Sequence, residues 1–241
     1  MDAVIQVRGL RKNYGGGLRP LRLSALSVMP GERVAIVGLD APAAEVLVNM
    51  LTGAMLPDEG DIQVFGRATS AIASADDWLS TLDRIGMVSP RAVLVDELTV
   101  AQSIAMAYTL SLEPIPDAVK ADVRRLAREA GLSDSHLEQR IVDVAPLIKA
   151  QCRLARALAQ QPLVLLLEHA NALVPTEAQG FGRAIAALAK TRGLAVIALT
   201  ADMAFARAVA DRVLVLDGAT GGLKEPSGRR RWLRWFGVRL I

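Results

Sequence analysis

Short apolar runs alternate along this chain with segments of helical periodicity, and glycine or proline residues separate many of them. The runs that predict β-strands cover residues 4–7, 21–28, 33–37, 61–65, 85–88, 163–167, 194–199 and 212–216. Strands read as period-two or continuous apolar runs bounded by turn residues. Because the later strands are separated by helical segments, the pattern favours an α/β protein with a largely parallel sheet.

Between about residues 100 and 160 the periodicity is mainly helical. We predict an apolar helix over Ala101–Leu112, an amphipathic helix over Asp117–Ala130 and a third helix over Leu147–Gln160. A further helix is predicted around residues 177–191, between two of the later strands. The section between residues 100 and 160 therefore forms a helical insert in the strand-rich part of the chain.

The loop after the strand Arg33–Val37 is the first candidate site. A strand, a loop that begins at Gly38 and a helix follow one another, as in the phosphate-binding pattern G-x-x-x-x-G-K-[ST]. Ala44 stands where that pattern has lysine, and Glu45 stands where it has a Ser or Thr hydroxyl for Mg²⁺. Pro42 donates no N–H to a phosphate. Glu45 facing a triphosphate would cost on the order of 1–4 kcal/mol. We therefore expect no phosphate cradle in this loop.

Composition narrows the class of protein. The 241 residues are 52% hydrophobic, but the apolar runs fall short of the roughly 18 residues that a membrane-spanning helix needs. The N-terminal residues do not have the pattern of a secretory signal, so we expect a cytoplasmic protein. Cys152 is the single cysteine and is expected to be a buried structural thiol. His136 and His169 are far apart in sequence, so no metal site is expected.

The last thirteen residues, Arg229–Ile241, differ from the rest of the chain because they are basic and aromatic and contain no acid. The residues proposed for membrane or partner contact are Arg229, Arg230, Arg231, Trp232, Arg234, Trp235 and Phe236. The pattern suits a helix at a membrane interface. Packing against the body of the protein is an alternative explanation. Basic and aromatic residues also fit nucleic acid, but no other feature of the chain supports that partner, and none is expected.

The order and spacing of short segments resemble the ATP-binding-cassette (ABC) family, the nucleotide-binding subunits of ABC transporters. The matching segments are 10–15, 51–53, 57–62, 65–66, 96–100, 155–158 with Pro162, and 210–216. The resemblance implies a P-loop NTPase-like cassette, with a mixed sheet core, an antiparallel β subdomain and an inserted helical subdomain. Its expected boundaries are 1–220 for the cassette, with the core at 1–90 and 155–220 and the helical subdomain at about 91–154, and 221–241 for the tail.

The residues that carry chemistry in that family differ here. Tyr14 matches the aromatic residue that stacks on adenine, although packing beside the adjacent glycines explains it equally well. The expected glutamine after the strand 85–88 is Pro90, the signature segment falls on Val144–Ile148, and the switch histidine is Ala201. The resemblance leaves Gly38, Ala44 and Glu45 as remnants of the nucleotide loop.

The position of the metal-binding aspartate and the catalytic glutamate is ambiguous. Counting from Pro162 places Glu168 at the aspartate and His169 at the glutamate, whereas counting back from residues 172–174 places Leu167 and Glu168 there. Glu168 is thus a vestigial catalytic candidate, and a solvated carboxylate at a strand end is the simpler interpretation. Both counts remain open at this point.

These departures predict a non-catalytic subunit, a pseudo-ATPase without ATP or Mg²⁺, that serves as a docking or regulatory component. The resemblance implies a membrane-embedded transporter subunit as partner, a dimer with itself or another cassette, and a place at the inner face of the cell membrane. Ala101–Leu112 lies near the family's docking groove, but this helix could equally pack within its own subdomain. The alternatives are an ATP-hydrolysing subunit with an atypical loop, for which ATP and Mg would be the cofactors, and a free adaptor.

Overall fold

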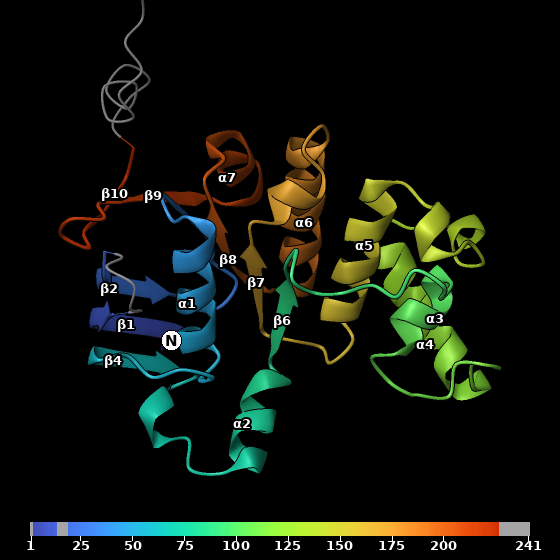
Figure 1. Ribbon diagram of the computed structural model, residues 1–241, viewed down its shortest axis with the longest axis horizontal. Coiled ribbons are helices and arrows are strands. Elements are labelled where there is room, and N and C mark those ends of the chain that lie inside the picture. Colours follow the sequence, from blue (N-terminus) through green and yellow to red (C-terminus); the bar gives the residue numbers. More distant parts are fainter. Residues whose placement is uncertain (1, 14–18, 227–241) are drawn as a thin grey trace, which may run out of the picture.

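The computed structural model describes residues 2–13 and 19–226, which build two β-sheets and a group of helices (Figure 1). Within these residues no helix combines the length and the apolarity that crossing a bilayer requires. The predicted turn at residues 15–17, Tyr14 and the whole of Arg229–Ile241 lie outside the described residues. What the sequence predicts for these segments therefore stays a prediction.

The larger sheet has six strands. Their order is β10 (Leu223–Lys224), β9 (Arg212–Leu216), β3 (Arg33–Val37), β8 (Ala195–Thr200), β7 (Val164–Glu168) and β6 (Ile85–Val88). All neighbouring pairs are parallel except the pair of β10 with β9. The predicted parallel core is confirmed. Parallel strands end at one edge of the sheet, so the segments that follow β3, β6 and β7 begin close together.

The smaller sheet is antiparallel and has the order β2 (Leu21–Val28), β1 (Ile5–Lys12), β4 (Glu59–Val64) and β5 (Arg67–Ala68). Its apolar side chains join α1 (Ala41–Leu51) and one face of the larger sheet, where Val34 and Ile36 are buried. The intervening residues Ala35 and Val37 face the opposite side, in the core that contains α6 and α7. The alternation in β3 thus fills a core on each face.

The remaining helices of the core are α2 (Ala75–Leu82), α6 (Ala178–Arg192) and α7 (Met203–Val209). Short 3₁₀ turns cover Thr69–Ala71, Asp134–His136, Ile141–Asp143 and Ala170–Leu173. The sequence analysis missed α2, α7, β5 and β10, which are all short. Strands 21–28, 33–37, 85–88 and 212–216 were predicted with the observed bounds, and the other predicted strands differ by a few residues at their ends.

The inserted helices α3 (Val100–Ala105), α4 (Asp117–Glu129) and α5 (Pro146–Ala157) lie at the end of the molecule away from the antiparallel sheet (Figure 1). The helical insert is therefore confirmed, and with it the predicted fold class. The exact domain boundaries stay a prediction. Cys152 is buried in α5, as expected, and burial raises the pKa of its thiol.

The predicted helix over Ala101–Leu112 is wrong in extent, because α3 ends at Ala105. The chain tightens there into i→i−3 hydrogen bonds, from Ala107 N to Ile104 O and from Tyr108 N to Ala105 O. The Tyr108 hydroxyl then donates to Ala159 O at 3.2 Å. The apolar residues of α3 are buried within the helical insert, so this helix offers no apolar face for docking.

Candidate functional site

The loop after β3 is shaped by Gly38 and Asp40. Gly38 has φ +106°, and a Cβ there would lie 3.2 Å from Leu216 O, so the loop requires glycine at this position. Asp40 caps α1, since its carboxylate accepts from Ala43 N at 2.9 Å and its carbonyl accepts from Ala44 N at 2.9 Å. Helix α1 therefore begins at Ala41, and the N–H groups of Ala43 and Ala44 in its first turn already bind within the chain.

Ala44 and Glu45 consequently lie on α1 rather than in an open loop. Ala44 is fully buried and contributes only a methyl group. The Glu45 side chain, 47% exposed, extends toward the end of β7. Neither side chain offers a positive charge to a phosphate.

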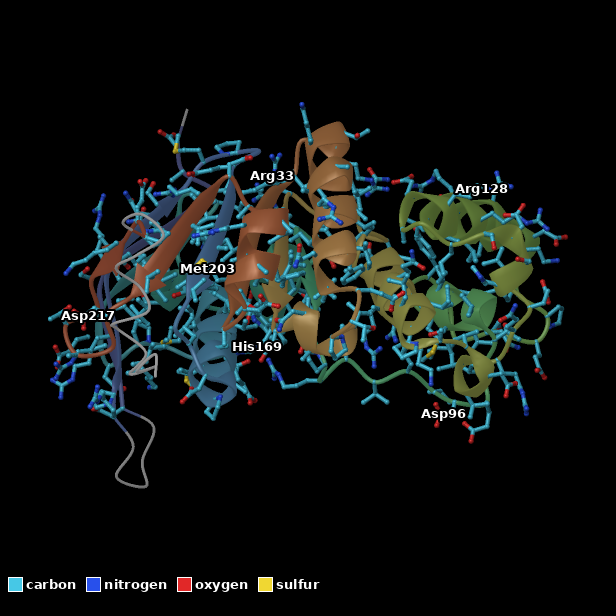
Figure 2. All side chains as sticks on the ribbon, turned by 90° about the horizontal axis from the view of Figure 1, so that it is seen from above. Arg33, Asp96, Arg128, His169, Met203 and Asp217 are labelled. Atoms are coloured by element: carbon cyan, nitrogen blue, oxygen red, sulfur yellow. The ribbon has the colours of Figure 1, made fainter. Side chains whose placement is uncertain are left out.

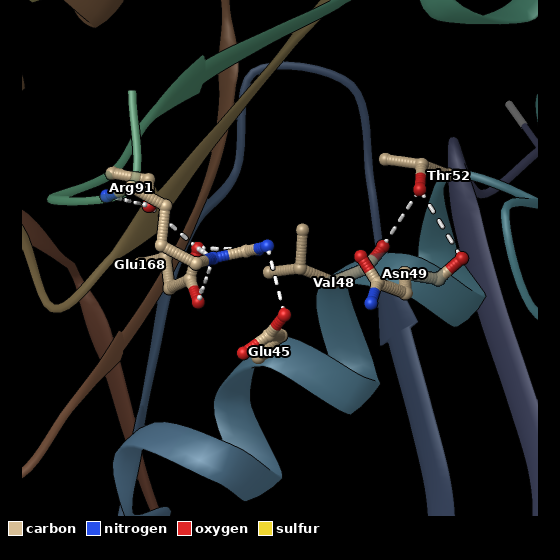
Figure 3. A network of polar contacts seen from close by, with 7 residues as sticks. Glu45, Val48, Asn49, Thr52, Arg91 and Glu168 are labelled. Atoms are coloured by element: carbon tan, nitrogen blue, oxygen red, sulfur yellow. Dashed lines mark hydrogen bonds and ion pairs between the residues drawn. The ribbon is translucent and has the colours of Figure 1, made fainter. Parts of the chain in front are cut away.

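Glu168, the last residue of β7, is buried, and both of its carboxylate oxygens accept hydrogen bonds (Figure 3). Its Oε2 accepts from Ser89 Oγ at 2.7 Å and from Arg91 Nη2 at 2.8 Å. Arg91 Nε lies 3.0 Å from each of the two carboxylate oxygens. The interpretation of Glu168 as a solvated carboxylate is therefore wrong, because the residue is only 4% exposed and two neighbours donate to it.

Arg91 also reaches helix α1, where Nη1 donates to Glu45 Oε1 at 3.1 Å (Figure 3). One guanidinium thus bridges two carboxylates that come from distant parts of the sequence. The hydrogen bonds to Glu168 raise the pKa of Arg91, and the side chain stays charged. Arg91 was not among the site residues predicted from the sequence. The only signal was its position directly after Pro90, where the family's glutamine was expected.

The turn after Glu168 holds a residue in an uncommon conformation. His169 has φ +44°, in the left-handed region that non-glycine residues seldom adopt, and its buried Nε2 has no hydrogen-bond partner among the residues that the structure describes. Two residues further, Asn171 Oδ1 accepts from Thr200 Oγ1 at 2.8 Å. This hydrogen bond connects the segment after β7 with the end of β8, next to Glu168.

The other positions singled out in the sequence lie elsewhere. Val144 and Pro146, in the segment aligned with the family signature, lie where α5 begins, and Val144 is buried. Pro90 lies between Ser89 and Arg91, and Ala201 precedes the Asp202 cap of α7. The structure brings Gly38, Ala44, Glu45 and Glu168 to one edge of the sheet, whereas Val144–Ile148 belongs to the helical insert.

A pocket of about 300 Å³ lies beside this edge, between the start of β2 and the loop after β3. Its charged lining residues are Arg19, Arg22 and Asp40. Arg22 is positioned by a hydrogen bond from Nη1 to Ala219 O at 3.1 Å. The carboxylate of Asp40 accepts from the first turn of α1, so Arg19 and Arg22 supply the positive charge of the pocket.

The two parts of the site suit different groups. The arginines of the pocket fit phosphate oxygens, which guanidinium groups bind well. The carboxylates of Glu45 and Glu168 are oxygen ligands of the kind that Mg²⁺ takes, but Arg91 is bonded to both of them. Within residues 2–13 and 19–226 no group of three or more acidic, His or Cys side chains is placed to hold a metal ion. The residues around Glu168 therefore do not fit a metal ion while Arg91 stays in place.

Comparison with known proteins gives a consistent result. The ABC transporter family profile matches residues 21–172. The methionine import ATP-binding protein MetN of Caulobacter vibrioides is 32% identical over 89% of this chain and 64% of its own length. The lipoprotein-releasing system ATP-binding protein LolD of Pseudomonas syringae pv. tomato is 31% identical over 90% of this chain and 96% of its own. The chain thus spans less than two thirds of the MetN relative.

Solved structures agree on the fold. The cbiO1 protein of Clostridium perfringens, part of the ABC transporter complex cbiONQ, has a TM-score of 0.76 at 21% identity and covers 93% of this chain and 88% of its own. The dimeric ATP-binding cassette MJ0796 bound to ADP and Pi has a TM-score of 0.73 at 18% identity and covers 93% and 99%. At these identities the similarity is one of fold.

The comparisons correct one expectation. The sequence analysis predicted that no cofactor is bound. Both relatives are named as ATP-binding proteins, and they align along nearly nine-tenths of this chain. The expectation of no cofactor is therefore contradicted.

Asp40→Ala tests how α1 begins. Loss of the cap is expected to lower the free energy of unfolding by about 1 kcal/mol, because the Ala43 N–H loses its acceptor. Asp40→Asn keeps an oxygen acceptor and is expected to cost much less. Urea unfolding followed by circular dichroism measures both variants. Equal stability of Asp40→Ala and the unchanged protein would contradict the role of Asp40 as the cap.

Proposed function

The chain belongs to the ABC transporter family, and from this premise we propose that it is the cassette subunit of a membrane transporter complex that binds ATP without hydrolysing it. In this proposal the chain works as a docking or regulatory component. Its partners are a membrane-embedded transporter subunit and a second cassette, either another copy of this chain or a different one. It lies in the cytoplasm at the inner face of the cell membrane.

The observation that carries the loss of hydrolysis is the Arg91 bridge. By the resemblance, Glu45 takes the place of the hydroxyl that ligates Mg²⁺, and Glu168, counted from Pro162, takes the place of the metal-binding aspartate. The position of Glu168 at the very end of β7, facing Glu45 across Arg91, supports this count over the other. Phosphoryl transfer relies on positioning and on stabilising charge, and Arg91 engages both carboxylates that would take part.

The remaining groups give hydrolysis little support. Ala44 supplies no ammonium for the β- and γ-phosphates, and the segment at Val144–Ile148 offers no glycine or serine to a partner's nucleotide. His169 stands where this count expects the catalytic glutamate. We infer that the chain is a degenerate member of the family at its own hydrolytic site.

For nucleotide binding we propose the pocket lined by Arg19 and Arg22. The relatives' names point to ATP as the ligand. Two arginine side chains line this pocket next to the loop after β3. The two guanidinium groups would bind phosphate oxygens in place of the absent lysine. Tyr14, which lies outside the described residues, keeps its predicted role beside the base.

A second candidate function is an ATP-hydrolysing subunit with an atypical loop. The names of the relatives favour it as well, and Glu168 is a carboxylate in the right region of the fold. The two candidates differ in what Glu168 does. In our proposal it is a structural partner of Arg91, whereas in the alternative it is a metal ligand or a general base.

ATP turnover separates the two candidates. We expect the purified full chain to release phosphate at less than about 0.01 s⁻¹, against roughly 10 s⁻¹ for an average enzyme. Glu168→Gln should leave this background rate unchanged. The LolD relative of Pseudomonas syringae, assayed in parallel, is the comparison protein. A measurable rate that Glu168→Gln abolishes would contradict our proposal and establish the alternative.

Isothermal titration with ATP tests the pocket. Arg22→Ala and Arg19→Ala are each expected to weaken binding about tenfold or more, because each removes a charge-assisted hydrogen bond worth about 1.5–3 kcal/mol. Arg8→Ala is the matched control, since Arg8 is exposed on β1 and donates to Gln6. Equal affinity of all three variants would contradict the assignment of this pocket.

Purification of the tagged full chain from native membranes under gentle conditions tests the transporter assignment. We expect a membrane-embedded protein to co-purify with it. Recovery of the chain without any membrane protein would instead support the free adaptor.

Removing residues 229–241 tests the basic, aromatic tail. Membrane association should fall if the tail contacts the membrane or the membrane-embedded partner. Unchanged association would contradict that role and favour packing of the tail against the body of its own protein.

A further inference from the structure

The segment of residues 89–98 connects β6 to the helical insert, and polar contacts hold it from both sides. On the side of the insert, two arginines of α5 bond its backbone. Arg153 Nε donates to Ala92 O at 2.8 Å, and Arg156 Nη1 donates to Val93 O at 3.0 Å. The segment is thus attached to α5 through its carbonyl groups.

On the side of the core, Arg91 makes the attachment. Its guanidinium binds Glu168 of β7 and Glu45 of α1, and its backbone N–H donates to Ser89 Oγ at 3.0 Å. Ser89 in turn donates to Glu168 at 2.7 Å. The consecutive residues 91–93 therefore connect α1 and β7 with α5.

Apolar packing contributes one side chain to this attachment, Leu94, which belongs to the core cluster that also contains Val37 and Val88. Val93 is 74% exposed and Val95 is 40% exposed, while Leu94 is the one residue between them that is buried. Further along, Asp96 O accepts from Val142 N and Leu98 O accepts from Ile141 N, and both contacts belong to the insert. The polar side-chain link from the segment to the core therefore rests on Arg91 with its two carboxylates and on Ser89, which donates to Glu168.

We propose that Arg91 is a latch that fixes the connecting segment, and through it α5 of the helical insert, to the core without any ligand. The planar guanidinium binds both oxygens of Glu168 while a third nitrogen reaches Glu45, a geometry that a lysine ammonium does not reproduce. The latch holds the exposed side chains of Val93 and Val95 in a fixed position. It is a property of the chain alone and does not depend on the proposed nucleotide binding.

Hydrogen exchange followed by mass spectrometry, on the full chain with no nucleotide added, tests the latch. In Arg91→Ala the amides of residues 89–98 are expected to exchange at least tenfold faster, and those at the start of α5 should also speed up. The amides of β8 and α6 should stay unchanged. Arg128→Ala is the matched control, because Arg128 lies on the surface of the insert (Figure 2) and makes a two-point ion pair with Asp134. It should leave residues 89–98 unchanged.

Arg91→Ala leaves Glu168 buried without its partner, so the single variant could lose its fold. The double variant Arg91→Leu/Glu168→Leu removes the latch and the buried charge together, and such replacements often preserve stability. We expect fast exchange confined to residues 89–98 and the start of α5 in this variant, and an intermediate effect in Arg91→Lys. Unchanged exchange at residues 89–98, or faster exchange spread evenly over the whole chain, in the double variant would overturn the proposal.

Discussion

The ion pair between Arg91 and Glu168 is the constraint on which the functional edge of this protein depends. A carboxylate at the end of a central strand, 4% exposed, is costly to keep charged unless it is paired and hydrogen-bonded. Ser89 and Arg91 supply three donor atoms to it. Removing one partner of a buried pair typically costs about 3–5 kcal/mol, and the partial exposure of Arg91 places this pair toward the lower end or below.

Sheet topology explains why these residues meet. Strands β3, β6 and β7 run parallel, so the segments that follow them leave the sheet at the same edge. Glu45 comes from the helix after β3, Arg91 from the segment after β6, and Glu168 from the end of β7. In open α/β sheets this edge is where ligands bind. Here the edge brings together two carboxylates and the one guanidinium that pairs with both, beside a pocket with two further arginines.

Much of this fold could be predicted from the sequence, because strand runs such as 85–88 and 212–216 are local patterns bounded by turn residues. Local patterns also predicted the helical insert, but not the end of α3. There the hydrogen bond from Tyr108 to Ala159 connects residues far apart in sequence. Glu168 was misjudged for the same reason. Its burial depends on Arg91, and nothing near Glu168 in the sequence indicates that partner.

The chain thus combines the fold of an ABC cassette with side chains at the carboxyl edge of its larger sheet that bind one another. A crystal structure of the full chain with Mg²⁺ and a non-hydrolysable ATP analogue tests this account most directly. We predict that Arg91 stays within hydrogen-bond distance of both Glu168 oxygens, with the phosphates of the analogue against Arg19 and Arg22. An Arg91 displaced from Glu168, with a metal ion on that carboxylate and the triphosphate bound over residues 38–45, would contradict it.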